Sequence, residues 1–164
     1  MSALMWDQYN MIKNITFKKL WNLILLHFSY RYTKTFNRQL NLGKPFSLSI
    51  EPTTSCNLGC PECPSGLKEF SRPTGRLKVD EHIKMLDEID SSVFYINYYF
   101  QGEPFLNPHF LELIKEAKRR KIYTATSTNA HFINEKKSKE IVKSGLDRLI
   151  ISIDGLTQET YEGY

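Results

Sequence analysis

The only three cysteines of the chain, Cys56, Cys60 and Cys63, lie within eight residues and form a C-x3-C-x2-C loop. Three thiolates can hold three corners of a cubic iron–sulfur cluster, in which each of the four irons needs a ligand. The fourth iron then has no protein ligand, and an open coordination position is where a metal centre does chemistry. The spacing therefore predicts a catalytic [4Fe-4S] centre.

A non-catalytic metal-binding module, holding zinc or an iron–sulfur cluster, is the alternative for the same loop. Zinc needs a fourth ligand, for which His82 or His109 would have to serve, and paired C-x2-C motifs are absent. An odd number of closely spaced cysteines does not fit a secreted disulfide framework. An oxygen-sensitive cluster instead indicates a reducing, cytoplasmic location.

The string from Ile50 to Pro64, which contains the three cysteines, resembles the cluster loop of the radical S-adenosylmethionine (radical SAM) superfamily. It is most similar to the branch that carries a C-terminal SPASM domain. The resemblance implies that the open iron binds SAM, and that one electron cleaves SAM to a 5′-deoxyadenosyl radical that abstracts a substrate hydrogen. Glu62 departs from the family pattern, in which an aromatic residue often precedes the third cysteine.

The same resemblance implies partners. Enzymes of this branch often act in peptide, protein or cofactor maturation, so a peptide or protein substrate is expected. The electron would come from a one-electron donor such as flavodoxin or ferredoxin. No nucleic-acid partner is expected, because the basic run Lys118–Lys121 is interpreted as a helix end, where cations favour the helix dipole.

Short apolar runs that alternate with helical patterns follow residue 45. Strands are predicted over residues 46–51, 93–100, 122–127 and 148–154. The aromatic residues Tyr95, Tyr98, Tyr99 and Phe100 of the second strand are interpreted as strand core, and the run 149–151 as a buried segment. Residues 64–78, rich in Pro and Gly, are predicted as a loop.

Helix starts are predicted from capping residues. The expected starts are Asp80, Asn107-Pro108, Asn134 and Thr157, and the helix from Asn134 should stop near Gly145. Strands that alternate with helices indicate right-handed βαβ units and a parallel sheet. The predicted fold class is α/β: a partial (β/α) barrel of the radical SAM type, truncated after about the fourth strand, with an N-terminal helical extension.

Two domains are expected, a basic amphipathic helical extension over residues 1–45 and the N-terminal half of a (β/α)6 barrel over residues 46–164. Complete (β/α)8 barrels need ~250 residues, and the (β/α)6 barrel of the family is also longer than this chain. The rest of the barrel and a SPASM domain would lie beyond residue 164. Such a fragment could be inactive, because a half barrel exposes a sheet edge.

Polar motifs follow the predicted strands, at the ends where parallel barrels gather their active sites. The expected cofactor-binding residues are Gln101, Gly102, Glu103, Pro104, Ser127, Asn129, Ser152 and Asp154. The first four resemble the Gly-Gly-Glu-Pro motif of the family, which binds the amino group of SAM. The last four match positions that contact its ribose and carboxylate, and Thr126 could share the role of Ser127. A turn or helix cap is the alternative for each of them.

Charge is concentrated in the N-terminal extension. Residues 1–45 carry seven Lys and Arg against one acid, Asp7, for a net charge of +6, whereas residues 46–164 carry fifteen against seventeen. The apolar run within 17–28 is shorter than the ~18–20 residues that span a bilayer. Residues 13–38 could contact a membrane surface peripherally, but Trp21, Leu25 and Phe28 fall at helical core spacing. That spacing favours a helix packed across the open end of the domain.

Overall fold

The computed structural model describes residues 3–89 and 91–163. Four parallel strands form one sheet in the order β1-β2-β3-β4. They are β1 (Ser47–Ser49), β2 (Tyr95–Asn97), β3 (Tyr123–Thr128) and β4 (Arg148–Ile151). Leu48 pairs with Ile96, and Ile96 pairs with Thr124, so the strands run in register from one edge of the sheet to the other. The predicted α/β class with a parallel sheet is confirmed.

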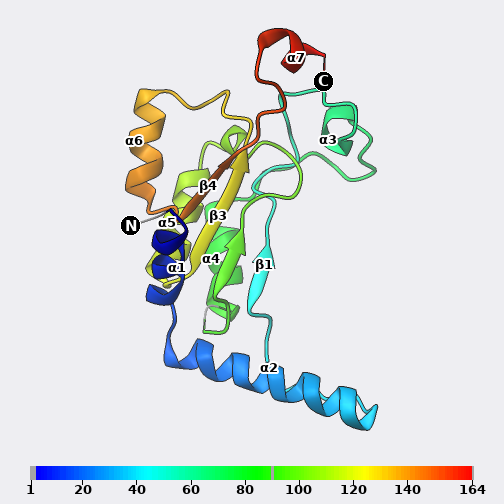
Figure 1. Ribbon diagram of the computed structural model, residues 1–164, viewed down its shortest axis with the longest axis vertical. Coiled ribbons are helices and arrows are strands. Elements are labelled where there is room, and N and C mark those ends of the chain that lie inside the picture. The colour runs from blue at the N-terminus through cyan, green and yellow to red at the C-terminus, as the bar shows by residue number, and fades with distance from the viewer. Residues whose placement is uncertain (1–2, 90, 164) are drawn as a thin grey trace.

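Helices connect successive strands, as βαβ units require. The three connecting helices are α4 (Val79–Ile89), α5 (Phe110–Arg119) and α6 (Glu135–Ser144), and α5 packs against both of the others. The core lies between these helices and β2, where Leu86, Ile96, Leu113 and Ile114 are fully buried. The carboxyl ends of the strands point to the end of the molecule that carries α3 (Pro64–Leu67) and α7 (Gln158–Glu162) (Figure 1).

Strands β1, β2 and β4 are shorter than predicted, whereas β3 keeps its predicted length. β2 ends at Asn97, so Tyr98 is buried in the core but Phe100 lies beyond the strand and is 74% exposed. The core interpretation is therefore wrong for Phe100. β4 ends at Ile151 rather than at residue 154, and Ile151 is 48% exposed. The predicted burial of this run is wrong because β4 is an edge strand among the residues that the structure describes.

Two predicted helix starts are displaced. Asp80 lies inside α4, which begins at Val79. Asn107 does not cap α5, because the 3-10 helix η1 (Pro104–Leu106) precedes it and His109 takes the N-cap position. The Asn107 amide instead donates to the carbonyls of Pro52 and Leu77, at 2.8 and 2.9 Å.

The other helix boundaries follow the sequence signals. Asn134 and Thr157 cap α6 and α7, and Gly145 ends α6 in the left-handed conformation. The segment predicted as a loop over 64–78 does contain one short helix, α3. Pro64 starts it because its fixed φ suits the first helical position.

The extension forms two helices, α1 (Ala3–Lys13) and α2 (Phe17–Phe36). The Asp7 carboxylate of α1 accepts a hydrogen bond from the Tyr123 hydroxyl of β3. Trp21 and Phe28 of α2 are 53% and 54% exposed, so the prediction that they pack on the domain is wrong for these two, whereas Leu25 is half-buried. Within the described part of the chain, none of the helices combines the length and the hydropathy needed to cross a bilayer.

Candidate functional site

The cysteine loop follows β1, and its three thiols are free and half-buried. The Cys63 amide donates to the Cys60 carbonyl at 3.2 Å, and Cys63 is the N-cap of α3. A Cβ added at Gly66 would lie 2.5 Å from the Cys60 carbonyl oxygen. Gly66 therefore lets α3 lie directly against the backbone between the second and third cysteines, which fixes the loop.

The electrostatics of the loop suit a cationic group. Burial raises the pKa of Cys60, and the nearby Cys56 thiolate, the Cys63 thiolate and the Asp154 carboxylate raise it further. Bound metal cations remove such repulsion, because a coordinating thiol is held deprotonated. Three free thiols in one loop are the donor set that a cluster with one open iron takes.

The Gln101–Pro104 segment is held against the chain that enters the cysteine loop. Gly102 has a φ of 77°, and a Cβ on it would lie 2.2 Å from the Thr53 carbonyl oxygen. The Glu103 amide donates to the Ser55 carbonyl at 2.7 Å. Only glycine fits at position 102, because any other residue would collide with backbone atoms and adopt an unfavourable φ.

Gln101, which replaces the first glycine of the family motif, bonds to the cysteine loop. Its Oε1 accepts from the Ser65 hydroxyl at 2.8 Å and from the Cys63 thiol at 3.5 Å. The Ser65 Oγ in turn accepts from the Gly102 amide at 3.0 Å. Ser65 was not predicted as a site residue, since no local sequence pattern distinguishes it.

Glu103 is 2% exposed, and both of its carboxylate oxygens are occupied by donors. One oxygen accepts from the Thr128 hydroxyl and the Phe105 amide, at 2.7 and 3.1 Å. The other accepts from the Asn129 amide at 3.0 Å. These charge-assisted bonds offset the cost of burying the carboxylate. Glu103 thus ties its motif to the end of β3.

The predicted residues at the carboxyl ends of β3 and β4 lie next to one another. The hydroxyl oxygens of Ser127 and Ser152 are 3.0 Å apart. The Asn129 side-chain Nδ2 donates to the Asn57 side-chain oxygen of the cysteine loop at 2.9 Å. Thr126 does not share the position of Ser127, because it is buried and donates to the Tyr98 carbonyl.

One cavity of about 180 Å³ joins these groups. Its lining comprises Cys56, Leu58, Tyr99, Phe100, Gly102, Glu103, Ser127, Thr128, Asn129 and Ser152. Tyr99 and Phe100 were interpreted as strand core and become site residues because β2 ends before them. Their position directly before Gln101 was the signal that could have placed them there.

The remaining predicted residues lie around this cavity or beside it. Asp154 and Cys60 line an adjacent cavity of about 210 Å³ together with Leu58 and Tyr161. Pro104 is buried at the start of η1. Gln101 and Cys63 are not among the lining residues of either cavity, and the Cys63 thiol donates a hydrogen bond to Gln101 Oε1.

The two histidines that the zinc alternative would need, His82 and His109, have other partners. In the described ranges, no three His, Cys, Asp or Glu side chains form a group that could hold a metal ion. A cluster differs from a single ion because each thiolate binds a separate iron. His82 is buried, and its Nε2 lies 2.8 Å from the Tyr98 hydroxyl oxygen. The Nδ1 of His109 lies 3.4 Å from Oε1 of Glu112.

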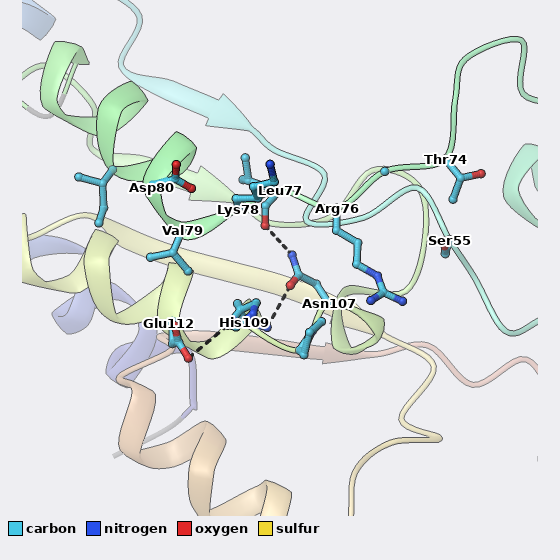
Figure 2. Close-up of a pocket in the computed structure, with 13 residues that line it drawn as sticks. Ser55, Thr74, Arg76, Leu77, Lys78, Val79, Asp80, Asn107, His109 and Glu112 are labelled. Atoms are coloured by element: carbon cyan, nitrogen blue, oxygen red, sulfur yellow. Dashed lines mark hydrogen bonds and ion pairs between the residues drawn. The ribbon is translucent and has the colours of Figure 1, made fainter.

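A larger cavity of about 1010 Å³ lies elsewhere, beside the amino ends of α4 and α5 (Figure 2). Figure 2 shows Asn107 bonded to Leu77 and His109 in its wall, with the ionic side chains of Asp80 and Glu112 nearby. None of the predicted cofactor contacts lines it. Its size therefore does not identify it as the site of chemistry.

Comparison with protein families gives a match to the model of the radical SAM superfamily over residues 50–163. The AdoMet-dependent heme synthase of Methanosarcina barkeri is 29% identical, over 73% of this chain and 34% of that protein. The PqqA peptide cyclase of Granulibacter bethesdensis is 30% identical, over 72% and 31%. The mycofactocin maturase MftC of Mycobacterium ulcerans is 34% identical, over 72% and 31%. The chain thus spans about a third of the length of these relatives.

Solved structures share the fold. SuiB of Streptococcus suis bound to S-adenosylmethionine aligns with a TM-score of 0.61 at 21% identity, over 82% of this chain and 30% of SuiB. BtrN in complex with AdoMet and 2-DOIA aligns with a TM-score of 0.55 at 21% identity, over 73% of this chain and 55% of BtrN. At this identity the likeness concerns the fold alone.

Proposed function

Because the chain belongs to the radical SAM superfamily, we propose that it is the cofactor-binding part of an enzyme that reductively cleaves S-adenosylmethionine to initiate hydrogen abstraction. The observation that carries the proposal is the cavity that joins Cys56 to Gly102, Ser127, Asn129 and Ser152. These residues come from the ends of four successive strand–loop units. Such a composite rim is where parallel barrels place their chemistry.

The cysteines and the rim residues have separate roles in this proposal. Cys56, Cys60 and Cys63 would hold a [4Fe-4S] cluster, which supplies the single electron that cleaves SAM. Backbone carbonyls near Gly102 would accept from the SAM amino group, since an ammonium needs acceptors. Glu103 keeps that backbone in place through its bonds to Thr128 and Asn129.

The hydroxyl and amide side chains would bind the rest of SAM. Ser127 and Ser152 can accept from or donate to ribose hydroxyls, and Asn129 can donate to the SAM carboxylate. Asp154 would accept from the ribose across the adjacent cavity, beside Cys60. Tyr99 and Phe100 add aromatic surface to the cavity lining, against which the apolar parts of SAM could pack.

A peptide or protein is the substrate class that we propose. Among the relatives, one is named as a peptide cyclase, and SuiB has been solved with its precursor peptide SuiA. A relative named as a heme synthase makes cofactor maturation the second candidate. Flavodoxin or ferredoxin as the electron donor and a reducing cytoplasm as the location complete the proposal. Both rest on the chemistry of the family.

Anaerobic reconstitution with iron and sulfide tests the proposal. Electron paramagnetic resonance of the reduced protein should show a [4Fe-4S] signal that shifts when SAM is added. Replacing Cys56 with Ala should abolish the signal. The double variant S127A/S152A should retain the cluster but weaken the SAM-induced shift, because two hydroxyls that line the cavity are lost.

Ser138→Ala is the matched control, since this exposed hydroxyl lies on α6 and bonds only its own helix. Its SAM response should equal that of the parent protein. Binding of zinc in place of a cluster would instead support the non-catalytic module. A cluster that does not respond to SAM would mean that this chain alone is an inactive fragment.

A further inference from the structure

Helix α2 exposes an apolar stripe, one margin of which, at Phe17 and Trp21, also lines a cavity of about 320 Å³. The stripe consists of Phe17, Leu20, Trp21, Ile24 and Phe28, which are 81%, 47%, 53%, 50% and 54% exposed. Their spacing of three and four residues places all five on one face of the helix. We refer to these five residues as the α2 stripe.

The opposite face of α2 carries buried polar side chains that bond to the protein, beside the half-buried Leu23 and Leu26. The Lys19 ammonium donates to the Arg120 and Lys121 carbonyls, at 3.3 and 2.6 Å. The Asn22 side chain exchanges two hydrogen bonds with the backbone of Lys44, at 2.8 and 2.9 Å. The helix is therefore fixed with these polar side chains inward, the reverse of an ordinary surface helix.

The α2 stripe is bordered by cations. No acid occurs between Asp7 and Glu51, a segment with seven Lys and Arg. At about 100° per residue, Lys18 and Lys34 fall on the two margins of the stripe, and both are exposed. An apolar face with cationic margins matches a surface that combines hydrocarbon with negative charge.

Helix α1 of the same extension also exposes aromatic residues. Trp6 and Tyr9 are 55% and 54% exposed, and their ring centroids are 5.9 Å apart. Together with Trp21, the extension thus exposes both tryptophans of the chain. Trp and Tyr are enriched where a membrane meets water, because their rings are apolar with one polar group.

We propose that the extension docks on an anionic lipid surface through the α2 stripe, with α2 lying in the plane of the headgroups. This surface lies outside the residues that match the family, which begin at residue 50. Figure 1 shows α2 at the end of the molecule opposite α3 and α7. Docking there leaves the rim with the cysteines open toward the solvent.

Vesicle binding by the full 164-residue chain tests the proposal. We expect co-flotation with vesicles of equal parts phosphatidylcholine and phosphatidylglycerol, weakened by salt, and no co-flotation with phosphatidylcholine alone. The Trp6→Phe variant leaves Trp21 as the single tryptophan. Its emission should shift to the blue on binding, because the indole leaves water.

Substitutions in the stripe and at its margins identify the contact surface. Trp21→Glu and Phe28→Glu should each weaken anionic vesicle binding roughly tenfold or more, from the lost burial of a large apolar side chain. Lys18→Gln and Lys34→Gln should each weaken it about fivefold. Circular dichroism should show unchanged helix content, since all four side chains are exposed.

Matched controls come from α6. Val142 is 80% exposed, and Lys136 is also exposed. Val142→Glu therefore places an acid at an exposed apolar position outside the extension, and Lys136→Gln removes an exposed cation there. Neither should alter vesicle binding. Absence of binding to anionic vesicles would overturn the proposal, as would binding that survives Trp21→Glu and Phe28→Glu. A dimer in sedimentation that Trp21→Glu dissociates, without lipid binding, would assign the stripe to a second copy of the chain instead.

Discussion

At the scale of single residues, the candidate site depends on two positions in the Gln-Gly-Glu-Pro segment that have no freedom to vary. Gly102 approaches the Thr53 carbonyl more closely than any side chain allows, and Glu103 accepts three hydrogen bonds while 2% exposed. Both residues align the segment with the cysteine loop and with β3. Their contribution is therefore to hold backbone groups where a cofactor would meet them.

Gly102→Ala should destabilise the protein by more than the ~1–3 kcal/mol that a strained backbone alone costs. The added Cβ would lie 2.2 Å from the Thr53 carbonyl oxygen, so the cysteine loop must shift as well. Urea unfolding measures the loss. Gly75→Ala is the control, because nothing lies within 4 Å of a Cβ there. Equal stability of the two variants would contradict the close approach.

Glu103→Gln should cost about 1–3 kcal/mol, because its amide NH2 group must face a buried donor. Either the Asn129 amide or the Phe105 amide and Thr128 hydroxyl then lose their acceptor. Chemical denaturation of the variant tests this. The exposed Glu112→Gln should change the unfolding free energy by less than about 0.5 kcal/mol. An unchanged free energy of unfolding in the Glu103→Gln variant would contradict a carboxylate that accepts from all three donors.

At the scale of elements, polar side chains of α2 bond the helix to the rest of the protein, beside the half-buried Leu25 and Leu26. Lys19 is 2% exposed, and its ammonium caps the chain just after α5. The loop that returns from α2 is held by Asn22 and by the Ser29 hydroxyl, which accepts from the Leu42 amide at 3.0 Å. The orientation of the α2 stripe follows from these bonds.

Lys19→Met should cost about 1–3 kcal/mol, because the Arg120 and Lys121 carbonyls lose their charged donor. Hydrogen exchange should also become faster in α2, whose attachment is weakened. Lys18→Met, one position earlier and exposed, is the control and should leave both measurements unchanged. Unaltered exchange in the Lys19 variant would show that other contacts hold the helix.

At the scale of the whole molecule, the core contains a neutral histidine that makes stability depend on pH. His82 is fully buried beside Tyr98. Burial, with a smaller contribution from the Arg120 charge, lowers its pKa from 6.5 to about 4. The unfolded chain therefore binds a proton at a higher pH than the folded chain does.

The contribution of neutral His82 to the free energy of unfolding should be complete above pH 6.5 and should decline as the pH falls toward 4. The loss over this range should be on the order of 3 kcal/mol. Unfolding free energies measured across this range in the parent and in His82→Gln should show a shallower decline in the variant. The exposed His109→Gln should keep the parental profile. Identical profiles for all three would place the acid sensitivity in other groups.

Local sequence patterns determined the order of strands and helices and the α/β class. Apolar runs located all four strands, and the capping residues Asn134 and Thr157 located two helices. The sequence patterns also placed the cysteine loop directly after the first strand. These predictions succeeded because strand pattern, capping and loop spacing are properties of neighbouring residues.

Only the tertiary structure decided which side chains meet. The bonds of Glu103 to Thr128, of Ser65 to Gln101 and of Lys19 to Lys121 join residues far apart in the chain. The helical spacing of Trp21 and Phe28 was visible in the sequence, but periodicity defines a face and not the direction in which that face points. For α2, the hydrogen bonds of Lys19 and Asn22 to backbone groups hold the opposite face against the protein, because polar groups that leave water need partners.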